Sequence, residues 1–356
     1  MTILTLNLDA LAHNLDVIRR AAPGAEVAAV VKADAYGLGA GPVSRRLWAE
    51  GVRSFFVARL SEGETLRTDL ADRDAAIYVL DGLLPGTADR LVAARLIPVL
   101  STPAQVHAAG PALPVALQID TGMNRQGLTL EAARAMADDL ARLNITLLMG
   151  HLGSATDPAE ARNPAQLASF RAARALFPDI RASFAASAGA FLGPDYRYDM
   201  VRAGISLYGG GPEERPDPRL KAVATLTAPI LDIRDLQPGD RVGYGTMFAA
   251  DRPMRIAVVG AGYADGFPRA AAGKAHVWCA GALRRVLTVN MDLMTVDLGP
   301  MLAKFGDRVE LVGEYAPIDD LAGAAQTVAH EVLTRLTPRA GSHKIWLPGP
   351  GSEIES

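Results

Sequence analysis

Eight short runs of apolar residues between residues 27 and 204 constrain the fold of this chain more than any other feature. Segments with helical periodicity, such as 131–144 and 163–176, separate the runs. A strand that is buried on both faces of a parallel sheet reads as a continuous apolar run. Strands that alternate with helices in this way predict a TIM (β/α)8 barrel, a fold that typically takes about 250 residues. The runs are 27–31, 54–58, 76–80, 96–100, 115–119, 145–149, 182–186 and 200–204.

The first helix of this barrel is predicted over residues 9–20. Asp9 is a typical capping residue, and Leu11, Leu15 and Ile18 follow it at helical spacing. We therefore expect the barrel domain to occupy residues 9–220.

The pattern changes in the segment 209–219, which is rich in glycine, proline and charge and is typical of an interdomain loop. Beyond it, short apolar runs separated by turn residues predict a mostly β domain over residues 221–356. One helix is expected within it, at 319–336, and the tail 348–356 is expected to be mobile. The predicted strands are 222–231, 255–259, 276–279, 286–289 and 309–312.

Composition excludes several classes of protein. The net charge of −3 and the isoelectric point near 6.1 leave no basic surface for nucleic acid. No apolar run reaches the roughly 18–20 residues that a membrane helix needs, and the N-terminus has no features of an export signal. The single cysteine, Cys279, cannot form an internal disulfide, which fits a reducing compartment. We expect a soluble, cytoplasmic protein without a membrane or nucleic-acid partner.

Polar side chains follow several of the predicted strands at the end where a TIM barrel carries its active site. Each has an ordinary alternative when taken alone: His151 as a hydrogen-bonded core histidine, Ser187 as a helix cap, Arg202 in a surface ion pair. Several such residues at the same ends of different strands favour a site instead. They are Lys32, Asp120, Arg125, His151, Ser187 and Arg202.

Lys32 is the strongest candidate for covalent chemistry. It follows a valine-rich strand directly, where burial would lower the pKa of its amine enough for a Schiff base to form with an aldehyde cofactor. The alternative for an isolated lysine is a solvated side chain at a strand end. Tyr36, Gly37 and Gly39 form a neighbouring loop that suits an anion, because its backbone can approach closely and its phenol can donate.

These segments together resemble the alanine racemases, the fold-type III enzymes that use pyridoxal phosphate. The resemblance covers both halves of the chain in the order found in that family. It implies a barrel followed by a β domain that also includes residues 1–8. The matching segments are Ala-Val-Val-Lys-Ala-Asp-Ala-Tyr-Gly (29–37), Asp-Thr-Gly-Met-Asn-Arg-Gln-Gly (120–127), Gly-His-Leu (150–152), Arg-Ala-Gly-Ile-Ser-Leu-Tyr-Gly (202–209), Val-Gly-Tyr-Gly (242–245), Gly-Tyr-Ala-Asp-Gly (262–266) and Met-Asp (291–292).

The resemblance implies pyridoxal 5'-phosphate as the cofactor, no metal ion, and an isomerase that interconverts L-alanine and D-alanine with two bases. Lys32 would bind the cofactor and serve one face of the substrate, and Tyr244 from the partner in a homodimer would serve the other. Arg202 would face the pyridine nitrogen, and His151 would connect it to Tyr244. The phosphate contacts would be Tyr36, Ser187, Gly204 and Ile205, and the substrate contacts Arg125, Met291 and Tyr263.

Two positions depart from the family pattern. Gln118 stands where many relatives carry a carbamylated lysine, and Ala186 where relatives often have asparagine. We expect Gln118 to orient Arg125 through its amide oxygen. The alternative for Tyr244 is an aromatic side chain in the core of the β domain.

Alternative activities differ in their use of these residues. A racemase of broader range, acting also on serine, would use every one of them. The same residues would serve an enzyme that supplies D-alanine and one that catabolises it. A fold-type III decarboxylase would place an acid where Arg202 stands. A pyridoxal phosphate carrier without catalytic activity would have no use for Tyr244.

Overall fold

The computed structural model describes residues 1–245, 247–336, 339 and 344–347. They form two compact units, residues 14–207 and residues 1–13 together with the described residues from 208 onward. Residues 9–13 and 208–220 thus group with the β domain rather than with the barrel. The predicted mobile tail, 348–356, lies outside the described residues. No helix in the described part of the chain is long and apolar enough to cross a membrane.

Parallel strands form a barrel in the first unit, as the apolar runs predicted. Neighbouring strands pair in chain order, and the last strand pairs with the first. The Arg202 N–H donates to the Ala185 carbonyl at 3.0 Å, which closes the ring between the last two strands. The strands are β2 (Glu26–Val30), β3 (Ser54–Val57), β4 (Ala76–Val79), β5 (Ile97–Leu100), β6 (Pro114–Gln118), β7 (Asn144–Met149), β8 (Ala182–Ser183) and β9 (Met200–Ala203).

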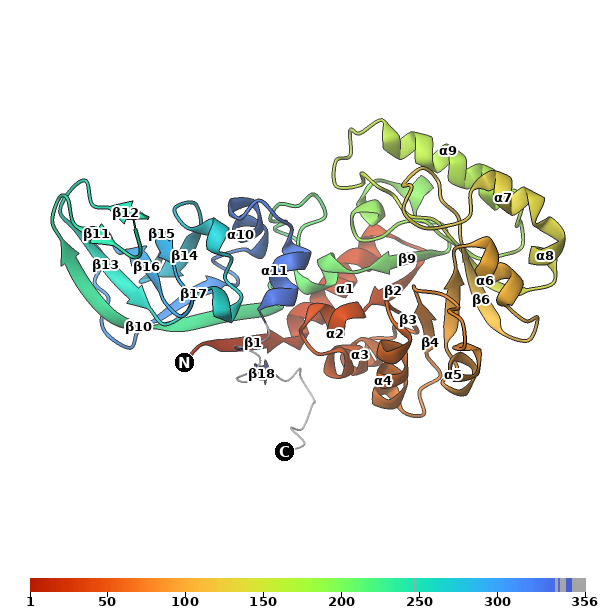
Figure 1. The fold of residues 1–356 in the computed structure, drawn as a ribbon, viewed down its shortest axis with the longest axis horizontal. Helices are drawn as coiled ribbons and strands as arrows, with labels where there is room; N and C mark the ends of the chain where they lie inside the picture. Colours follow the sequence, from red (N-terminus) through yellow and green to blue (C-terminus); the bar gives the residue numbers. More distant parts are fainter. Residues whose placement is uncertain (246, 337–338, 340–343, 348–356) are drawn as a thin grey trace. The chain divides into compact units, whose positions relative to one another are not determined.

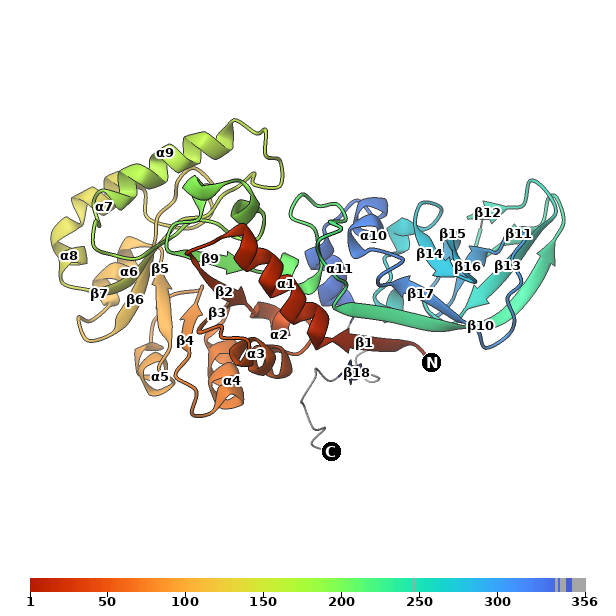
Figure 2. The same ribbon diagram turned by 180° about the vertical axis from the view of Figure 1, so that it is seen from behind.

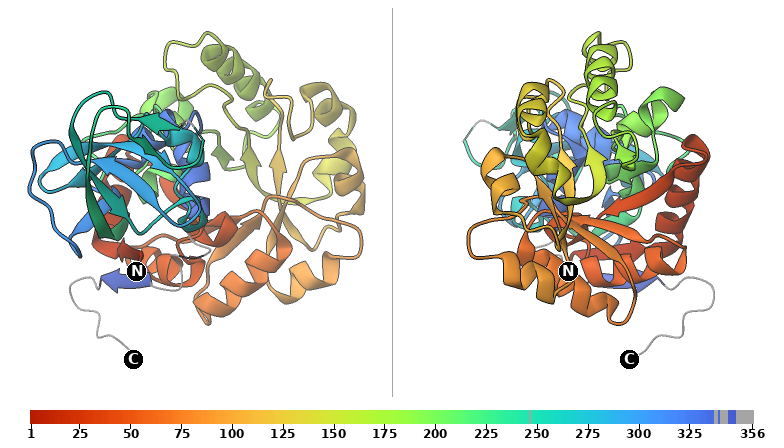
Figure 3. Two further views of the ribbon diagram at one scale, coloured as in Figure 1. Left: turned by 60° about the vertical axis from the view of Figure 1, so that its left-hand side comes forward. Right: turned by 90° about the vertical axis from the view of Figure 1, so that its right-hand side faces the viewer.

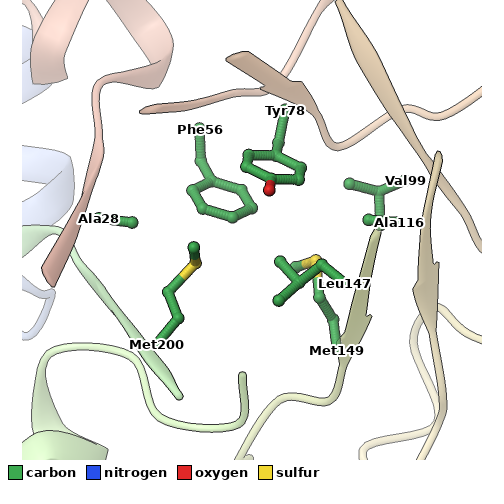
Figure 4. Close-up of a cluster of buried hydrophobic side chains, with 8 residues drawn as sticks. All are labelled: Ala28, Phe56, Tyr78, Val99, Ala116, Leu147, Met149 and Met200. Carbon is green, nitrogen blue, oxygen red and sulfur yellow. The ribbon is translucent and has the colours of Figure 1, made fainter. Parts of the chain in front are cut away.

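Helices surround these strands, as the right-hand view of Figure 3 shows. The interior of the barrel is filled by apolar side chains from seven of the strands. The rings of Phe56 and Tyr78 stack there, with centroids 4.5 Å apart (Figure 4). The barrel is therefore a packed core whose chemistry is confined to its ends. The helices of this unit are α2 (Lys32–Tyr36), α3 (Ala40–Ala49), α4 (Leu60–Leu70), α5 (Ala88–Ala93), α6 (Pro103–Ala108), α7 (Leu130–Ala135), α8 (Ala137–Ala141) and α9 (Arg162–Arg174), with short 3-10 turns at η1 (Ala188–Phe191), η2 (Pro194–Tyr196) and η3 (Ile205–Tyr208).

The first helix, α1 (Leu8–Ala21), belongs to both units and begins one residue earlier than predicted. Its cap is Asn7, not Asp9. The Asn7 side chain accepts hydrogen bonds from the N–H groups of Asp9 and Ala10, each at 3.0 Å. An N-cap residue accepts from the second and third helical N–H groups, and here only Asn7 is placed to do so.

The second unit is built on the long strand β10 (Ala224–Leu236), which runs the length of the sheet (Figures 1 and 2). Its first half pairs with β1 (Ile3–Asn7) and β17 (Arg308–Val312), and its second half pairs with β13 (Met254–Val259). Successive antiparallel pairings then lead from β13 back to β17, so the sheet closes on itself. The remaining elements are β11 (Arg241–Val242), β12 (Phe248–Ala249), η4 (Tyr263–Asp265), η5 (Arg269–Ala271), β14 (His276–Cys279), β15 (Ala282–Val289), β16 (Met294–Asp297), α10 (Ile318–Ala324), α11 (Ala329–Arg335) and β18 (Lys344–Leu347).

The single helix predicted over 319–336 is wrong, because two helices occupy this region. Gln326 adopts a left-handed φ of 57° and ends α10. The Thr327 N–H donates to the Ala322 carbonyl at 2.9 Å and the Gln326 N–H to the Gly323 carbonyl at 3.1 Å. This pair of bonds is a Schellman motif, in which glycine usually takes the left-handed position. The end of α10 could not be predicted from the sequence, because glutamine occupies the position where glycine is usual.

Candidate active site

Lys32 extends from the end of β2, as predicted, and its side chain is half-buried. Burial lowers the pKa of its amine below the ordinary value, and the positive charge of Arg125 lowers it further. Glu62 opposes this change through its negative charge. A lysine in this position has a larger fraction of free amine at neutral pH than a solvated lysine, which is the condition for attack on an aldehyde.

The segment that follows Lys32, labelled α2, is a left-handed turn, where we predicted a loop. Ala33, Asp34, Ala35 and Tyr36 have φ values of 53°, 55°, 52° and 57°. This conformation costs an L-residue roughly 1–2 kcal/mol, so surrounding contacts must hold the turn. Gly37 ends it, and its N–H donates to the Ala33 carbonyl at 2.7 Å. The turn carries Tyr36 into a buried position close to the end of β9.

Tyr36 meets the segment after β9 at a place that carries groups suited to an anion. The phenol oxygen of Tyr36 lies 2.5 Å from the place that a Cβ atom on Gly204 would take, so only glycine fits there. The hydroxyl of Ser187 accepts the N–H of Gly204 at 2.8 Å and the N–H of Ser206 at 3.3 Å. Ser187 makes no hydrogen bond as a helix cap. The Ser187 hydroxyl, which accepts from these N–H groups, and the Tyr36 phenol are the kinds of donor that bind phosphate.

Arg202 is buried within the barrel end, with 4% of its surface exposed, and is not part of a surface ion pair. Its guanidinium donates to the Ser183 carbonyl at 2.9 Å, the Ser183 hydroxyl at 2.7 Å and the Gly150 carbonyl at 2.7 Å. Burial lowers its pKa to about 10, and Arg125 contributes. Arg202 is therefore still charged at neutral pH, and the groups that accept its hydrogen bonds fix its orientation.

His151 accepts from Arg202. The distance from the guanidinium Nη2 to the His151 Nδ1 is 3.2 Å, and since an arginine can only donate, Nδ1 carries no proton. Burial lowers the pKa of His151 to about 3, with Arg202 and then Arg125 adding to the effect. The imidazole is neutral at physiological pH, and its proton is on Nε2. A neutral ring in this tautomer can donate from Nε2 to a second group while it accepts from Arg202.

The loop after β6 brings Arg125 to the same end of the barrel. Arg125 is exposed, yet its charge acts on Lys32, His151 and Arg202. Asp120 does not join the site; its Oδ1 accepts the N–H groups of residues 122, 123 and 124 at 2.9, 2.9 and 3.1 Å and shapes the loop. Gln118 is buried at the end of β6. The described contacts include no hydrogen bond between Gln118 and Arg125, so its predicted role stays a prediction.

Tyr244 lies in the turn between β11 and β12, with 80% of its surface exposed. The alternative of a core aromatic residue is therefore wrong. The flanking glycines, Gly243 and Gly245, have positive φ values of 82° and 63°, a conformation that glycine adopts without steric cost. The turn presents the phenol outward from the β domain.

Tyr263 and Met291 occupy adjacent turns of the same β domain. The Tyr263 N–H donates to the Asn290 carbonyl, and the Ala264 N–H to the Met291 carbonyl, each at 3.0 Å. Gly262 permits this approach, since a Cβ there would lie 2.2 Å from the Asn290 carbonyl oxygen. Both side chains are exposed, Tyr263 by 43% and Met291 by 54%. Backbone hydrogen bonds therefore join the two turns that carry the predicted substrate contacts of this domain.

Arg339 links these two turns through ion pairs, a contact that was not predicted from the sequence. Its guanidinium binds both carboxylate oxygens of Asp265, at 2.9 and 2.7 Å, and Asp292 at 2.5 Å. Asp265 is buried, with 1% of its surface exposed, and also accepts from the Gly262 N–H at 2.9 Å and the Thr2 hydroxyl at 3.1 Å. Asp265 belongs to the turn of Tyr263, and Asp292 follows Met291.

Two other supporting residues were also missed. The Glu62 carboxylate accepts the N–H of Ala33, next to Lys32, at 2.9 Å. Gln166, on α9, donates to the carbonyl of His151 at 3.1 Å and accepts the N–H of Gly153 at 2.8 Å. Glu62 could have been found only as a helix-capping residue, because it stands three positions after Arg59 at the start of a helix. No local signal indicates its reach to Ala33.

The chain matches two family profiles over nearly its whole length. The profile of the alanine racemase N-terminal domain matches residues 6–212, and that of the alanine racemase C-terminal domain matches residues 223–343. The chain belongs to the alanine racemase family. The predicted resemblance and the predicted fold class, a (β/α)8 barrel followed by a mostly β domain, are confirmed.

Individual family members agree with this assignment. An alanine racemase of Methylobacterium sp. (strain 4-46) is 43% identical over 350 residues, covering 95% of this chain and 96% of the relative. Another, from Rhodospirillum rubrum, is 43% identical and covers 95% and 94%. The crystal structure of alanine racemase from Bartonella henselae with covalently bound pyridoxal phosphate has a TM-score of 0.90 at 32% identity, covering 97% of this chain and 99% of that one. Biosynthetic alanine racemase from Pseudomonas aeruginosa also scores 0.90 at 32% identity, covering 98% and 99%.

Proposed function

We propose that this protein interconverts L-alanine and D-alanine with pyridoxal 5'-phosphate, and that Lys32 and Tyr244 are its two bases. The observation that carries the proposal is Lys32, an amine of lowered pKa at the same barrel end as the buried pair of Arg202 and His151. The names of the family members support the activity.

The residues of the barrel end fit the cofactor. Lys32 offers an amine for the aldehyde carbon. The phosphate would be held by Tyr36, by Ser187 and by the backbone of Gly204 and Ile205, where glycine leaves room that a Cβ would fill. When bound, the cofactor supplies an electron-withdrawing group that acidifies the Cα–H of an attached amino acid.

Arg202 would face the ring nitrogen of the bound cofactor. A charged guanidinium donates and cannot accept, so Arg202 would donate to that nitrogen and would leave no acid there to protonate it. A decarboxylase would place an acid at this position, so Arg202 favours proton transfer over decarboxylation. Four hydrogen bonds fix the guanidinium at the barrel end.

Inversion at Cα requires a proton acceptor on each side of the substrate. Lys32 would hold or release the proton on one side. Tyr244, from a second copy of the chain, would do so on the other, with His151 donating from Nε2 to the phenol oxygen while its Nδ1 accepts from Arg202. Arg125 and the backbone of Met291 would bind the substrate carboxylate, and Tyr263 would narrow the entrance.

A homodimer with shared active sites is part of this proposal. It is supported by the exposure of Tyr244, Tyr263 and Met291, at 80%, 43% and 54%, on the β domain. Residues that are exposed on their own unit could reach the active site of a second chain. A cytoplasmic location is also proposed, since the lone Cys279 is buried and suits a reducing compartment.

The test is to incubate the purified protein and cofactor with L-alanine and to follow circular dichroism together with carbon dioxide release. We expect the optical signal to decay to zero without carbon dioxide, and D-alanine to give the mirror-image decay. Release of carbon dioxide would identify a decarboxylase. Stable signals with both enantiomers would leave only cofactor binding, and either result would contradict the proposal.

A further inference from the structure

Glu62 connects the ends of two barrel strands through one carboxylate. Its Oε1 accepts the N–H of Ala33 at 2.9 Å, while its Oε2 accepts the N–H of Ala58 at 2.7 Å and of Arg59 at 3.1 Å. A glutamate in the first turn of a helix commonly reaches back to the residue before the helix, which accounts for the bond from Arg59. The bonds from Ala33 and Ala58 have no part in capping.

The bond to Ala33 lies where the backbone most needs support. Lys32 is followed at once by the left-handed turn 33–36, a conformation that L-residues avoid. Within the turn, Asp34 secures the far end, since its Oδ1 accepts the Ala40 N–H at 2.7 Å and its carbonyl the Gly39 N–H at 2.8 Å. At the near end, Glu62 supplies a hydrogen bond from another helix. It fixes the residue next to Lys32 relative to the end of β3.

We propose that Glu62 is a positioning residue for Lys32. Its carboxylate sets the start of the left-handed turn, and with it the direction in which the lysine side chain leaves β2. The inference deepens the proposed function and rests on it, because Lys32 is the residue that would carry the cofactor and move the proton.

Glu62 also sets the charge around Lys32. Among the described residues, the charged or titratable groups that act electrostatically with the amine are Arg125 from the loop after β6, His151 from the end of β7, and Glu62 from α4. His151 is neutral and Arg125 is positive, so Glu62 is the negative member of this set. Removing its charge should favour the free amine over the ammonium ion, a change that a purely mechanical support would not produce.

The experiment compares Glu62→Gln with Glu64→Gln. Glu64 lies on the same helix, and the described partner of its carboxylate is Arg90, at 2.6 Å, rather than the segment of Lys32. In the cofactor-free protein, the pH dependence of acetylation of Lys32 is followed by peptide mass. In the holoenzyme, kcat and KM are measured in both directions.

For Glu62→Gln we expect the acetylation midpoint to move to lower pH and kcat to fall by about tenfold or more, as a misplaced reacting group costs, with KM little changed. Glu64→Gln should alter neither. An unchanged midpoint overturns the inference even if kcat falls, because a general loss of stability would lower kcat without changing the titration of the Lys32 amine. If the wild-type holoenzyme does not racemise alanine but the midpoint shifts, the proposed function fails and the role of Glu62 stands.

Discussion

Substituting Gly204 by alanine tests the packing of the predicted phosphate pocket. The new Cβ would lie 2.5 Å from the phenol oxygen of Tyr36, far inside contact distance, while the next atom of the ring would be at an ordinary 3.5 Å. Gly204 does not have a positive φ, so the backbone accepts alanine and only the hydroxyl is in the way. Tyr36 is 6% exposed and cannot swing into solvent.

The expected magnitude follows from this single close contact. Forcing an atom into a packed site costs about 1–3 kcal/mol, so the free energy of unfolding of Gly204→Ala should fall by that amount. Displacing the phenol should also remove a charge-assisted bond to phosphate, worth about 1.5–3 kcal/mol. The dissociation constant of the cofactor should then rise by about 10- to 100-fold.

Urea unfolding of the cofactor-free protein measures the first effect, and titration with pyridoxal phosphate the second. Gly110→Ala is the control, since a Cβ there meets no atom within 4 Å. Adding Tyr36→Phe to Gly204→Ala should restore the unfolding free energy but not the cofactor affinity. If Gly204→Ala matches the control, or if the double variant is no more stable than Gly204→Ala, the packing argument is refuted.

Two further predictions concern the charges that the fold holds. His151 has a pKa of about 3 in the folded chain against 6.5 ordinarily, so the unfolded chain binds an extra proton between these pH values. Stability should therefore fall as pH decreases from about 6.5, by up to about 1.4 kcal/mol per pH unit. Urea titrations of His151→Gln should show that this pH dependence of the free energy of unfolding is lost. If it is retained, a group other than His151 causes it. Arg339→Ala should lower the free energy of unfolding by about 2 kcal/mol, because it strands the buried Asp265. Arg335→Ala, which breaks a surface pair with Glu331, should change it by less than about 0.5 kcal/mol, and equal losses would contradict the account.

The barrel could be predicted because its strands are buried on both faces. Every one of the eight apolar runs contains a strand, including the run 182–186, which holds only the two-residue β8. Burial leaves a mark in the sequence that does not depend on distant contacts. The ends of helices and strands leave a weaker mark in the sequence. Asn7 and Asp9 are both suitable caps, and only the path of the backbone decides between them.

The residues around Lys32 mark the limit of sequence reasoning at the site. The position of Lys32, His151, Ser187 and Arg202 at one barrel end could be predicted because each is a polar residue at the carboxyl end of a parallel strand. The left-handed turn could not be predicted, because alanine, aspartate and tyrosine occupy it, whereas glycine is the residue that normally indicates a positive φ.

The supporting contacts were not found either. Glu62 and Arg339 act through backbone groups or carboxylates that are remote in the chain, Ala33 in one case and Asp265 in the other. Such long-range bonds have no periodicity and no fixed spacing, so only the folded chain reveals them.

The central claim, that each active site combines Lys32 of one chain with Tyr244 of another, is tested most directly by mixing two inactive variants. Lys32→Ala should lose the visible absorbance of the lysine-bound cofactor, and Tyr244→Phe should keep it, while neither racemises alanine. After subunit exchange, half of the dimers should be mixed, and each mixed dimer should hold one intact site, restoring about a quarter of wild-type activity. A mixture that exchanges subunits and stays inactive, or Tyr244→Phe that racemises on its own, would contradict the claim.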